Sequence, residues 1–123
     1  MKKILVVEDD ESQRLLYRDE LTEAGYEVLL AANGKEALKR LEDAKPDLII
    51  LDIIMPEMDG MEVLGRIIRE YRDTPIILNT AYSSYRADFM SWAADAFVVK
   101  SADLAELKQK MQQILGESET PEA

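Results

Sequence analysis

The 123-residue sequence contains no cysteine and no histidine. Without cysteine it has no disulfide, no thiolate nucleophile and no thiolate metal ligand. Without histidine it lacks the usual general base and the usual zinc ligand of proteins. Every apolar run falls short of the roughly 20 residues that span a bilayer, and acidic residues interrupt the apolar start at position 8. We therefore expect a single cytoplasmic domain without a signal peptide and without membrane contact.

Basic residues are also scarce: 15 Lys and Arg stand against 25 Asp and Glu, which gives a formal net charge of −10. This balance disfavours direct nucleic-acid binding, because phosphate contacts need cationic side chains. It suits a protein that binds a cation or a basic surface, although a high net charge can also serve solubility alone. The charge by itself therefore leaves these interpretations open.

Short apolar runs and helix-start signals alternate along the chain. Strands are predicted at residues 2–7, 26–30, 47–51, 74–79 and 96–99. Helix starts are indicated at residues 10–13, 33–36, 59–62, 83–84 and 103–106. The alternation predicts an α/β fold with a doubly wound, five-stranded parallel sheet of the flavodoxin-like (βα)5 type and strand order 2-1-3-4-5. We expect this domain at residues 1–116, followed by a disordered acidic tail at residues 117–123.

Polar residues directly follow four of the predicted strands: Glu8 and Asp9, Asp52, Thr80 and Lys100. Because the carboxyl ends of parallel strands meet at one edge of a sheet, we expect these side chains to lie close together. Each of these residues also has an ordinary structural explanation. Acidic residues are favourable at helix starts, threonine often caps a helix, and a lysine after a strand is usually solvated. Their occurrence together is what indicates a site. The neighbouring acid Asp10 is interpreted as a helix cap and not as a ligand.

Three clustered carboxylates either raise a pKa or hold a cation, since two of them about 4 Å apart repel by about 4 kcal/mol at an effective dielectric constant of about 20. Oxygen ligands alone favour Mg²⁺, Mn²⁺ or Ca²⁺ over Zn²⁺. An aspartate can also act as a nucleophile that forms an aspartyl phosphate, and phosphoryl transfer needs positioning and charge neutralisation more than a base. The residues therefore suit phosphoryl transfer to Asp52 beside Mg²⁺, with Lys100 and Thr80 contacting phosphoryl oxygens.

At this point the sequence resembles the receiver domains of two-component response regulators, in particular the single-domain, chemotaxis-regulator-like kind. The resemblance covers Lys2 to about Leu115. It is carried by four motifs: Val6–Asp10, Leu51–Gly60, Thr80-Ala81 and Val98–Lys100.

The resemblance implies a role for each site residue. Asp52 is the phospho-acceptor, Thr80 the switch hydroxyl, and Lys100 the lysine that pairs with the phosphoryl group. Phe97 takes the aromatic switch position, where the family often has tyrosine. The implied Mg²⁺ (or Mn²⁺) ligands are Glu8, Asp9, Asp52 and the backbone carbonyl of Ile54.

The resemblance also places two residues along the path of hydrolytic water, Ile54 and Tyr82. Ile54 cannot orient water and Tyr82 is bulky, so we expect a long-lived phosphoryl group. The implied activity is limited to Mg²⁺-dependent self-phosphorylation and slow self-dephosphorylation, so the protein is not an enzyme in the usual sense. The implied phosphodonor is a histidine kinase or a histidine phosphotransfer protein. The implied output face, formed by the fourth helix, fifth strand and fifth helix, would contact a downstream protein or a second copy of the chain. Whether the chain stands alone or is a fragment stays open.

Three other interpretations are weighed against this one. An aspartyl-phosphate phosphatase of the haloacid dehalogenase type needs an acid two residues after the nucleophile, where Ile54 stands. A flavin-binding flavodoxin needs a Ser/Thr/Gly-rich phosphate loop after the first strand, where three acids stand. A degenerate receiver that acts only as an interaction module is favoured by one residue, Ser101, because the family commonly has proline after the lysine.

Overall fold

Five parallel strands form the sheet, in the predicted order β2-β1-β3-β4-β5. The computed structural model describes residues 1–52, 65–67, 69–71, 73–80, 95–100 and 103–116. The strands are β1 (Lys3–Val7), β2 (Glu27–Ala31), β3 (Leu48–Leu51), β4 (Ile76–Thr80) and β5 (Ala96–Val99). The fully described helices are α1 (Glu11–Glu23), α2 (Gly34–Ala44) and α5 (Ala105–Leu115). Of the predicted third helix, residues 65–67 and 69–70 are described and helical. The predicted fourth helix and the acidic tail lie outside the described residues.

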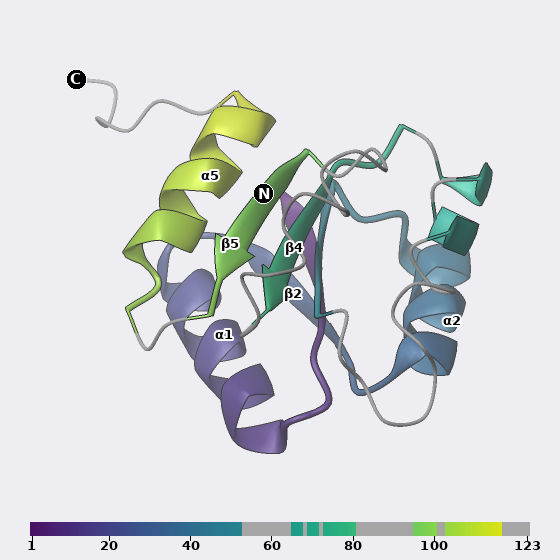
Figure 1. Cartoon of the computed structure of the whole chain (residues 1–123), viewed down its shortest axis with the longest axis horizontal. Helices are drawn as coiled ribbons and strands as arrows, with labels where there is room; N and C mark the ends of the chain where they lie inside the picture. The colour runs from purple at the N-terminus through teal and green to yellow at the C-terminus, as the bar shows by residue number, and fades with distance from the viewer. Residues whose placement is uncertain (53–64, 68, 72, 81–94, 101–102, 117–123) are drawn as a thin grey trace.

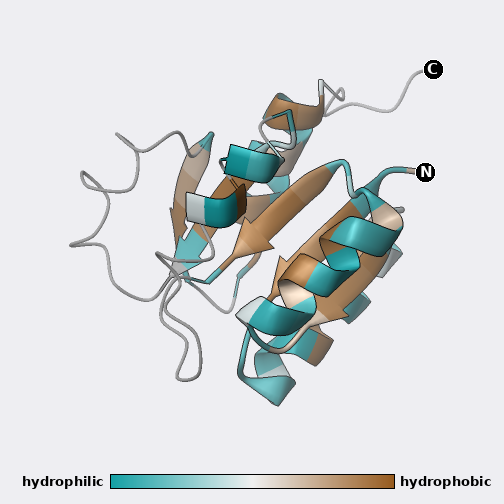
Figure 2. Cartoon of the chain, turned by 90° about the vertical axis from the view of Figure 1, so that its right-hand side faces the viewer, coloured by the Kyte–Doolittle hydropathy of each residue, from teal (hydrophilic) through white to brown (hydrophobic). Residues whose placement is uncertain are grey.

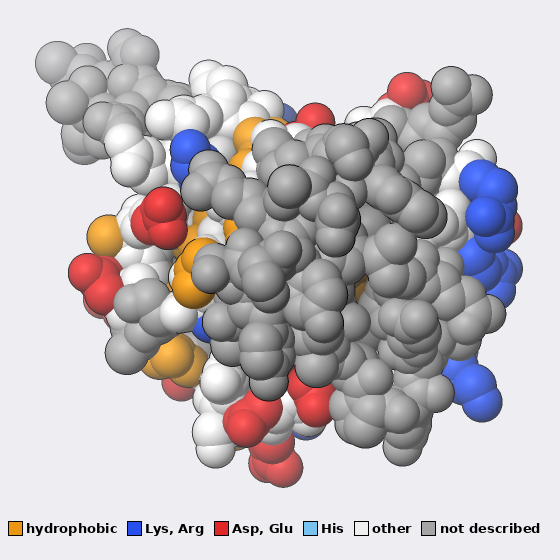
Figure 3. All heavy atoms as spheres, in the orientation of Figure 1, with side chains coloured by type: hydrophobic (Ala, Val, Ile, Leu, Met, Phe, Trp, Pro, Cys, Tyr) orange, Lys and Arg blue, Asp and Glu red, His pale blue; other side chains and the backbone are white. Residues whose placement is uncertain are grey.

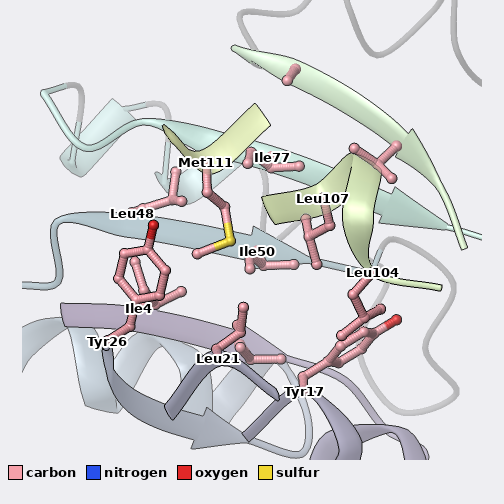
Figure 4. Close-up of a cluster of buried hydrophobic side chains, with 13 residues drawn as sticks. Ile4, Tyr17, Leu21, Tyr26, Leu48, Ile50, Ile77, Leu104, Leu107 and Met111 are labelled. Carbon is pink, nitrogen blue, oxygen red and sulfur yellow. The ribbon is translucent and has the colours of Figure 1, made fainter. Parts of the chain in front are cut away.

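Helices cover both faces of the sheet, as a doubly wound fold requires. Figure 1 shows α1 and α5 on one side, and α2 with the helical residues 65–67 and 69–70 on the other. Two buried clusters correspond to these faces. One combines strand residues with Ala37 and Leu41 of α2 and with Ile67. The other combines strand residues with side chains of α1 and α5, among them Leu21 and Met111 (Figure 4). Figure 2 shows the strands as predominantly hydrophobic, in agreement with a sheet that is buried on both faces.

Helix ends follow the capping signals of the sequence. Asp10 accepts a hydrogen bond from the N–H of Gln13 at 3.1 Å and caps α1. Asn33 accepts one from the N–H of Glu36 at 2.9 Å and caps α2. Gly116 ends α5 in the left-handed region, at φ 73°, where glycine avoids the steric penalty of a side chain. The predicted cap at Asp10 and the predicted helix start at residues 33–36 are therefore confirmed.

Charged side chains are unevenly distributed. Figure 3 shows Lys and Arg side chains along the right-hand side, over α2, and Asp and Glu side chains at the lower end of the molecule, where α1 begins. The arrowheads of the strands point towards that lower end (Figure 1). Within the described part of the chain, no helix has the length and apolar character needed to cross a membrane.

Candidate functional site

The register of the central strands brings Glu8 and Asp52 together. Val7 of β1 is paired with Leu51 of β3, so the residues that follow them emerge side by side at the carboxyl edge. The ladder continues one step further, because the N–H of Asp52 donates to the carbonyl oxygen of Val7 at 3.1 Å. One carboxylate oxygen from each of Glu8, Asp9 and Asp52 lies within 4.8 Å of the other two. The predicted cluster of three acids is therefore present.

Lys100 joins two of these acids. It follows β5 and reaches the centre of the sheet edge, where its Nζ lies 2.5 Å from Oε1 of Glu8 and 2.8 Å from Oδ2 of Asp52. The two carboxylates are almost fully buried, with 1% of Glu8 and 4% of Asp52 exposed, whereas Asp9 is exposed. The ammonium group thus lies between two buried acids, and the third acid faces solvent.

Burial and pairing act in opposite directions on this group of charges. Burial raises the pKa of Glu8, and this effect outweighs the stabilisation of its charge by Lys100 and by the N–H of Asp10, which donates to Oε2 at 3.1 Å. For Lys100, burial alone would lower the pKa, but the hydrogen bonds to Asp52 and Glu8 outweigh it and raise the pKa. Lys100 therefore stays protonated, while ionised Glu8 is energetically costly.

The donor set of this cluster fits Mg²⁺. Three carboxylates and one ammonium leave two negative charges when all are ionised, which one divalent cation balances. Mg²⁺ takes one or two protein carboxylates, keeps several waters, and so leaves positions for phosphoryl oxygens. Glu8, Asp9 and Asp52 are the described residues that could hold it, and the cation would supply charge neutralisation for an incoming phosphoryl group.

The other predicted site residues are described to different extents. Thr80 is the last residue of β4, and its backbone is paired with Val99 of β5, whereas its side chain lies outside the described part. Phe97 is 5% exposed and packs in the cluster on the α2 side of the sheet. Ile54, Tyr82 and Ser101 lie outside the described residues. The geometry of their proposed roles therefore stays a prediction.

Arg14 was not predicted as part of the site. Its Nη1 donates to the carbonyl oxygens of Glu8 at 2.9 Å and of Asp9 at 3.0 Å. The sequence contained a signal for it, since Arg14 is the fourth residue of α1, where the helix dipole disfavours a cation. Such a residue is better explained by a specific partner than by the helix itself.

A buried hydrogen bond between two neutral side chains, Asn79 and Tyr17, was also not predicted. Nδ2 of Asn79 in β4 donates to the hydroxyl oxygen of Tyr17 in α1 at 2.8 Å, and both residues are buried. Figure 4 shows the Tyr17 ring beside Leu104, with its hydroxyl towards the arrowhead end of the strands. The signal in the sequence was an asparagine inside an apolar strand, a position where this residue is depleted.

Comparisons with known proteins agree with this geometry. A profile of the response regulator receiver domain matches residues 4–112. The crystal structure of the response regulator TrrA from Thermotoga maritima, in complex with Mg²⁺–BeF, is 52% identical, with a TM-score of 0.87 over 93% of this chain and 99% of that one. TrrA in complex with the histidine kinase ThkA gives 52% identity and a TM-score of 0.86 over 94% of this chain and 99% of that one.

A longer relative matches over part of its length. The alkaline phosphatase synthesis transcriptional regulatory protein PhoP of Bacillus subtilis is 38% identical over 120 residues, which are 96% of this chain and 50% of PhoP. The chain spans about half the length of the curated relatives it matches.

Proposed function

This chain belongs to the response regulator receiver domain family of two-component signalling, and we propose from this premise that it is a phosphorylation switch with Asp52 as the phospho-acceptor. The observation that carries the proposal is the buried Asp52 carboxylate, which has the Lys100 ammonium at 2.8 Å and the carboxylates of Glu8 and Asp9 close by. A nucleophilic carboxylate in a preorganised, charged site is what aspartyl-phosphate formation requires.

In the proposed reaction an Asp52 carboxylate oxygen attacks the phosphorus atom of the donor. A phosphorus–oxygen bond to Asp52 forms as the bond between phosphorus and the donor's leaving atom breaks, and the leaving group departs with that electron pair. Glu8, Asp9 and Asp52, with the carbonyl of Ile54 as the family resemblance implies, would hold Mg²⁺ (or Mn²⁺). The bound cation would neutralise charge on the phosphoryl oxygens. The Mg²⁺–BeF complex of TrrA supports this assignment, since beryllium fluoride resembles a phosphoryl group in shape and charge.

Lys100 has a role both before and after phosphoryl transfer. Before transfer, its ammonium is shared by Glu8 and Asp52. After transfer, the phosphoryl group adds a charge of roughly −1.5 to −2 and three acceptor oxygens, so Lys100 and the hydroxyl of Thr80 turn towards it. Thr80 is the last residue of β4, and Lys100 directly follows β5. A movement of both residues at these strand ends changes Phe97 and the output face. This couples a local charge to a wider surface.

The proposed phosphodonor is a histidine kinase or a histidine phosphotransfer protein, an assignment supported by the complex of TrrA with ThkA. The proposed receiver of the signal is a downstream protein or a second copy of this chain, bound through the segment that follows β4 together with β5 and α5. The proposed domain limits remain residues 1–116.

The test is to incubate the protein with Mg²⁺ and acetyl phosphate and to measure intact mass. We expect one phosphoryl adduct on the parent chain, none on Asp52→Ala, and one on Asp95→Asn, which alters an acid at the opposite edge of the sheet. An adduct that survives Asp52→Ala contradicts the proposal, as does its absence from the parent.

The same mass measurement, repeated over time after removal of the donor, tests the long lifetime of the phosphoryl group proposed from Ile54 and Tyr82. Loss of the adduct within seconds would contradict that proposal.

A further inference from the structure

The loop between β1 and α1, residues 8–10, is held by a side chain of α1. Nη1 of Arg14 donates to two successive carbonyl oxygens, those of Glu8 at 2.9 Å and Asp9 at 3.0 Å. Because each peptide unit is planar, fixing two successive carbonyls fixes the orientation of two peptide planes and of the Asp9 backbone between them. The side-chain directions of the acid pair follow from this backbone.

The remaining contacts of the loop lie within it or join it to α1 and to the strands beside it. The N–H of Asp10 donates to Oε2 of Glu8 at 3.1 Å, and the carbonyl of Asp10 accepts from the N–H of Arg14 at 2.9 Å. The Glu8 side chain is also held by Lys100. Asp9 is the exposed member of the acid cluster, so its placement depends most on how its own backbone is held.

Arg18 lies one turn further along α1 and differs in its contacts. Its guanidinium pairs with Asp19 at 3.0 Å, and both side chains are exposed. The two arginines thus have the same charge and lie on the same helix, but only Arg14 is bonded to the loop among the contacts of the described residues. Arg18 is therefore a matched reference for the effect of charge alone.

We propose that Arg14 is a positioning residue for the metal site: it holds the Glu8–Asp9 backbone so that both carboxylates face Asp52, and thereby sets the affinity for Mg²⁺. The inference rests on the proposed function, because it concerns the same acids. Arg14 bonds to carbonyl oxygens and not to the carboxylates. Residues that orient metal ligands in this indirect way typically change metal affinity by roughly 10–100-fold when they are replaced.

Positioning and simple charge predict opposite results. As a cation near three carboxylates, Arg14 repels Mg²⁺, so a loss of charge alone would raise the Mg²⁺ affinity. As a residue that positions the loop, Arg14 favours Mg²⁺ binding, so its replacement would lower the Mg²⁺ affinity. The Arg14→Lys variant separates the two effects further, because lysine keeps the charge but carries its donors on a flexible stem and not on a rigid, planar guanidinium group.

The experiment is isothermal titration of the unphosphorylated protein with Mg²⁺, for the parent, Arg14→Met, Arg14→Lys and Arg18→Met. We expect Arg14→Met to weaken Mg²⁺ binding by about 10-fold or more, Arg14→Lys to weaken it by less, and Arg18→Met to leave it unchanged or slightly stronger. A second readout is the Mg²⁺ dependence of Asp52 phosphorylation by acetyl phosphate. We expect the half-saturating Mg²⁺ concentration to rise in Arg14→Met, with the rate restored at saturation.

Each outcome decides between the hypotheses. Parent-like or tighter Mg²⁺ binding by Arg14→Met overturns the positioning role and leaves the proposed function intact. Absence of Mg²⁺ binding by the parent overturns the metal site itself. Should Arg14→Met fail to fold, as judged by circular dichroism, Arg14→Lys carries the test, and parent-like affinity in that variant contradicts the inference.

Discussion

Acidic residues lie at both edges of this sheet, but they have different roles at the two edges. At the amino edge, Asp47 and Asp95 each stand alone, directly before β3 and β5. At the carboxyl edge, Glu8, Asp9 and Asp52 are clustered within 4.8 Å. Both arrangements place acids next to strands, so the presence of an acid beside a strand does not by itself indicate its role. Their surroundings do.

Each acid of the amino edge is bonded to a single residue of the neighbouring strand. Asp47 donates its N–H to the carbonyl of Lys3 at 2.8 Å and accepts the N–H of Lys3 through Oδ2 at 2.7 Å. Asp95 makes the same pair of bonds with Ile76, at 2.9 and 2.8 Å. Both acids are exposed, so they satisfy the first residue of β1 and of β4 without a large desolvation cost. These acids stabilise strand pairing.

The carboxyl edge shows the opposite balance. Two of its acids are buried beside one lysine, and burial raises the pKa of Glu8, which marks its ionised form as costly. Replacement of such buried charge by apolar groups is often neutral or stabilising in proteins. An arrangement that costs stability needs another explanation, and charge balance by a cation and a phosphoryl group provides one. The comparison predicts that substitutions at the two edges will affect different measurements.

The largest effect is expected at Lys100. Lys100→Met leaves Glu8 and Asp52 buried without this ammonium, and we expect the free energy of unfolding at neutral pH without Mg²⁺ to fall by about 3–5 kcal/mol. The cost should shrink on acidification. Burial raises the pKa of Glu8 and Lys100 opposes this rise, so the pKa of Glu8 in the folded state is higher in the variant than in the parent. The variant therefore gains more stability than the parent as the pH falls towards the unfolded pKa of about 4.3. Urea unfolding across this pH range measures both effects.

The control for Lys100 is Lys108→Met. Lys108 pairs with Glu20 at 3.0 Å, but the two side chains are 34% and 40% exposed, so we expect a cost below about 1 kcal/mol. Equal costs for the two lysines would contradict the view that the carboxyl edge is a distinct, buried electrostatic cluster.

The next effect concerns Mg²⁺. At a concentration 100 times its dissociation constant, a ligand that binds only the folded state raises the free energy of unfolding by about 2.7 kcal/mol. We expect this gain in the parent and its near-complete loss in Asp9→Asn. Asp95→Asn makes the same charge change at the amino edge and should keep the gain, because an asparagine oxygen can still accept the N–H of Ile76.

Urea unfolding with and without Mg²⁺ decides this prediction. A full gain in Asp9→Asn removes Asp9 from the metal ligands. A lost gain in Asp95→Asn shows instead that the two edges are coupled, which would break the comparison between them.

Much of the fold and of the charged cluster could be predicted from the sequence, because the signals are local. Capping residues such as Asp10 and Asn33 act over three residues, and each strand carries its own apolar pattern. The boundaries of β4 were less accurate: it begins two residues later than predicted and extends to Thr80. The N–H of Thr74 is used in a turn with Tyr71, and Pro75 has no N–H to donate.

The missed features depend on partners far apart in the chain or on main-chain groups. Asp47 bonds to Lys3, 44 residues away, and nothing near Asp47 in the sequence indicates that partner. Arg14 bonds to carbonyl oxygens, which every residue possesses and no side-chain pattern identifies. Lys100 was assigned to the site through its strand end, but its shared position between Glu8 and Asp52 follows only from the packed sheet.

The smallest effect is expected at the neutral pair of Tyr17 and Asn79, which tests whether the carboxyl edge is special for its position or for its charge. Tyr17→Phe removes one buried hydrogen bond, so we expect a loss of about 1 kcal/mol at neutral pH and an unchanged gain from Mg²⁺. Burial raises the pKa of Tyr17, so its contribution is fully present below the unfolded pKa of about 10 and is lost as the pH rises through the folded value. Urea unfolding of parent and variant between about pH 8 and 11 should show a constant difference that shrinks above about pH 10. A smaller Mg²⁺ gain in Tyr17→Phe would place this neutral pair within the site, and the division between the edges would then follow position and not charge.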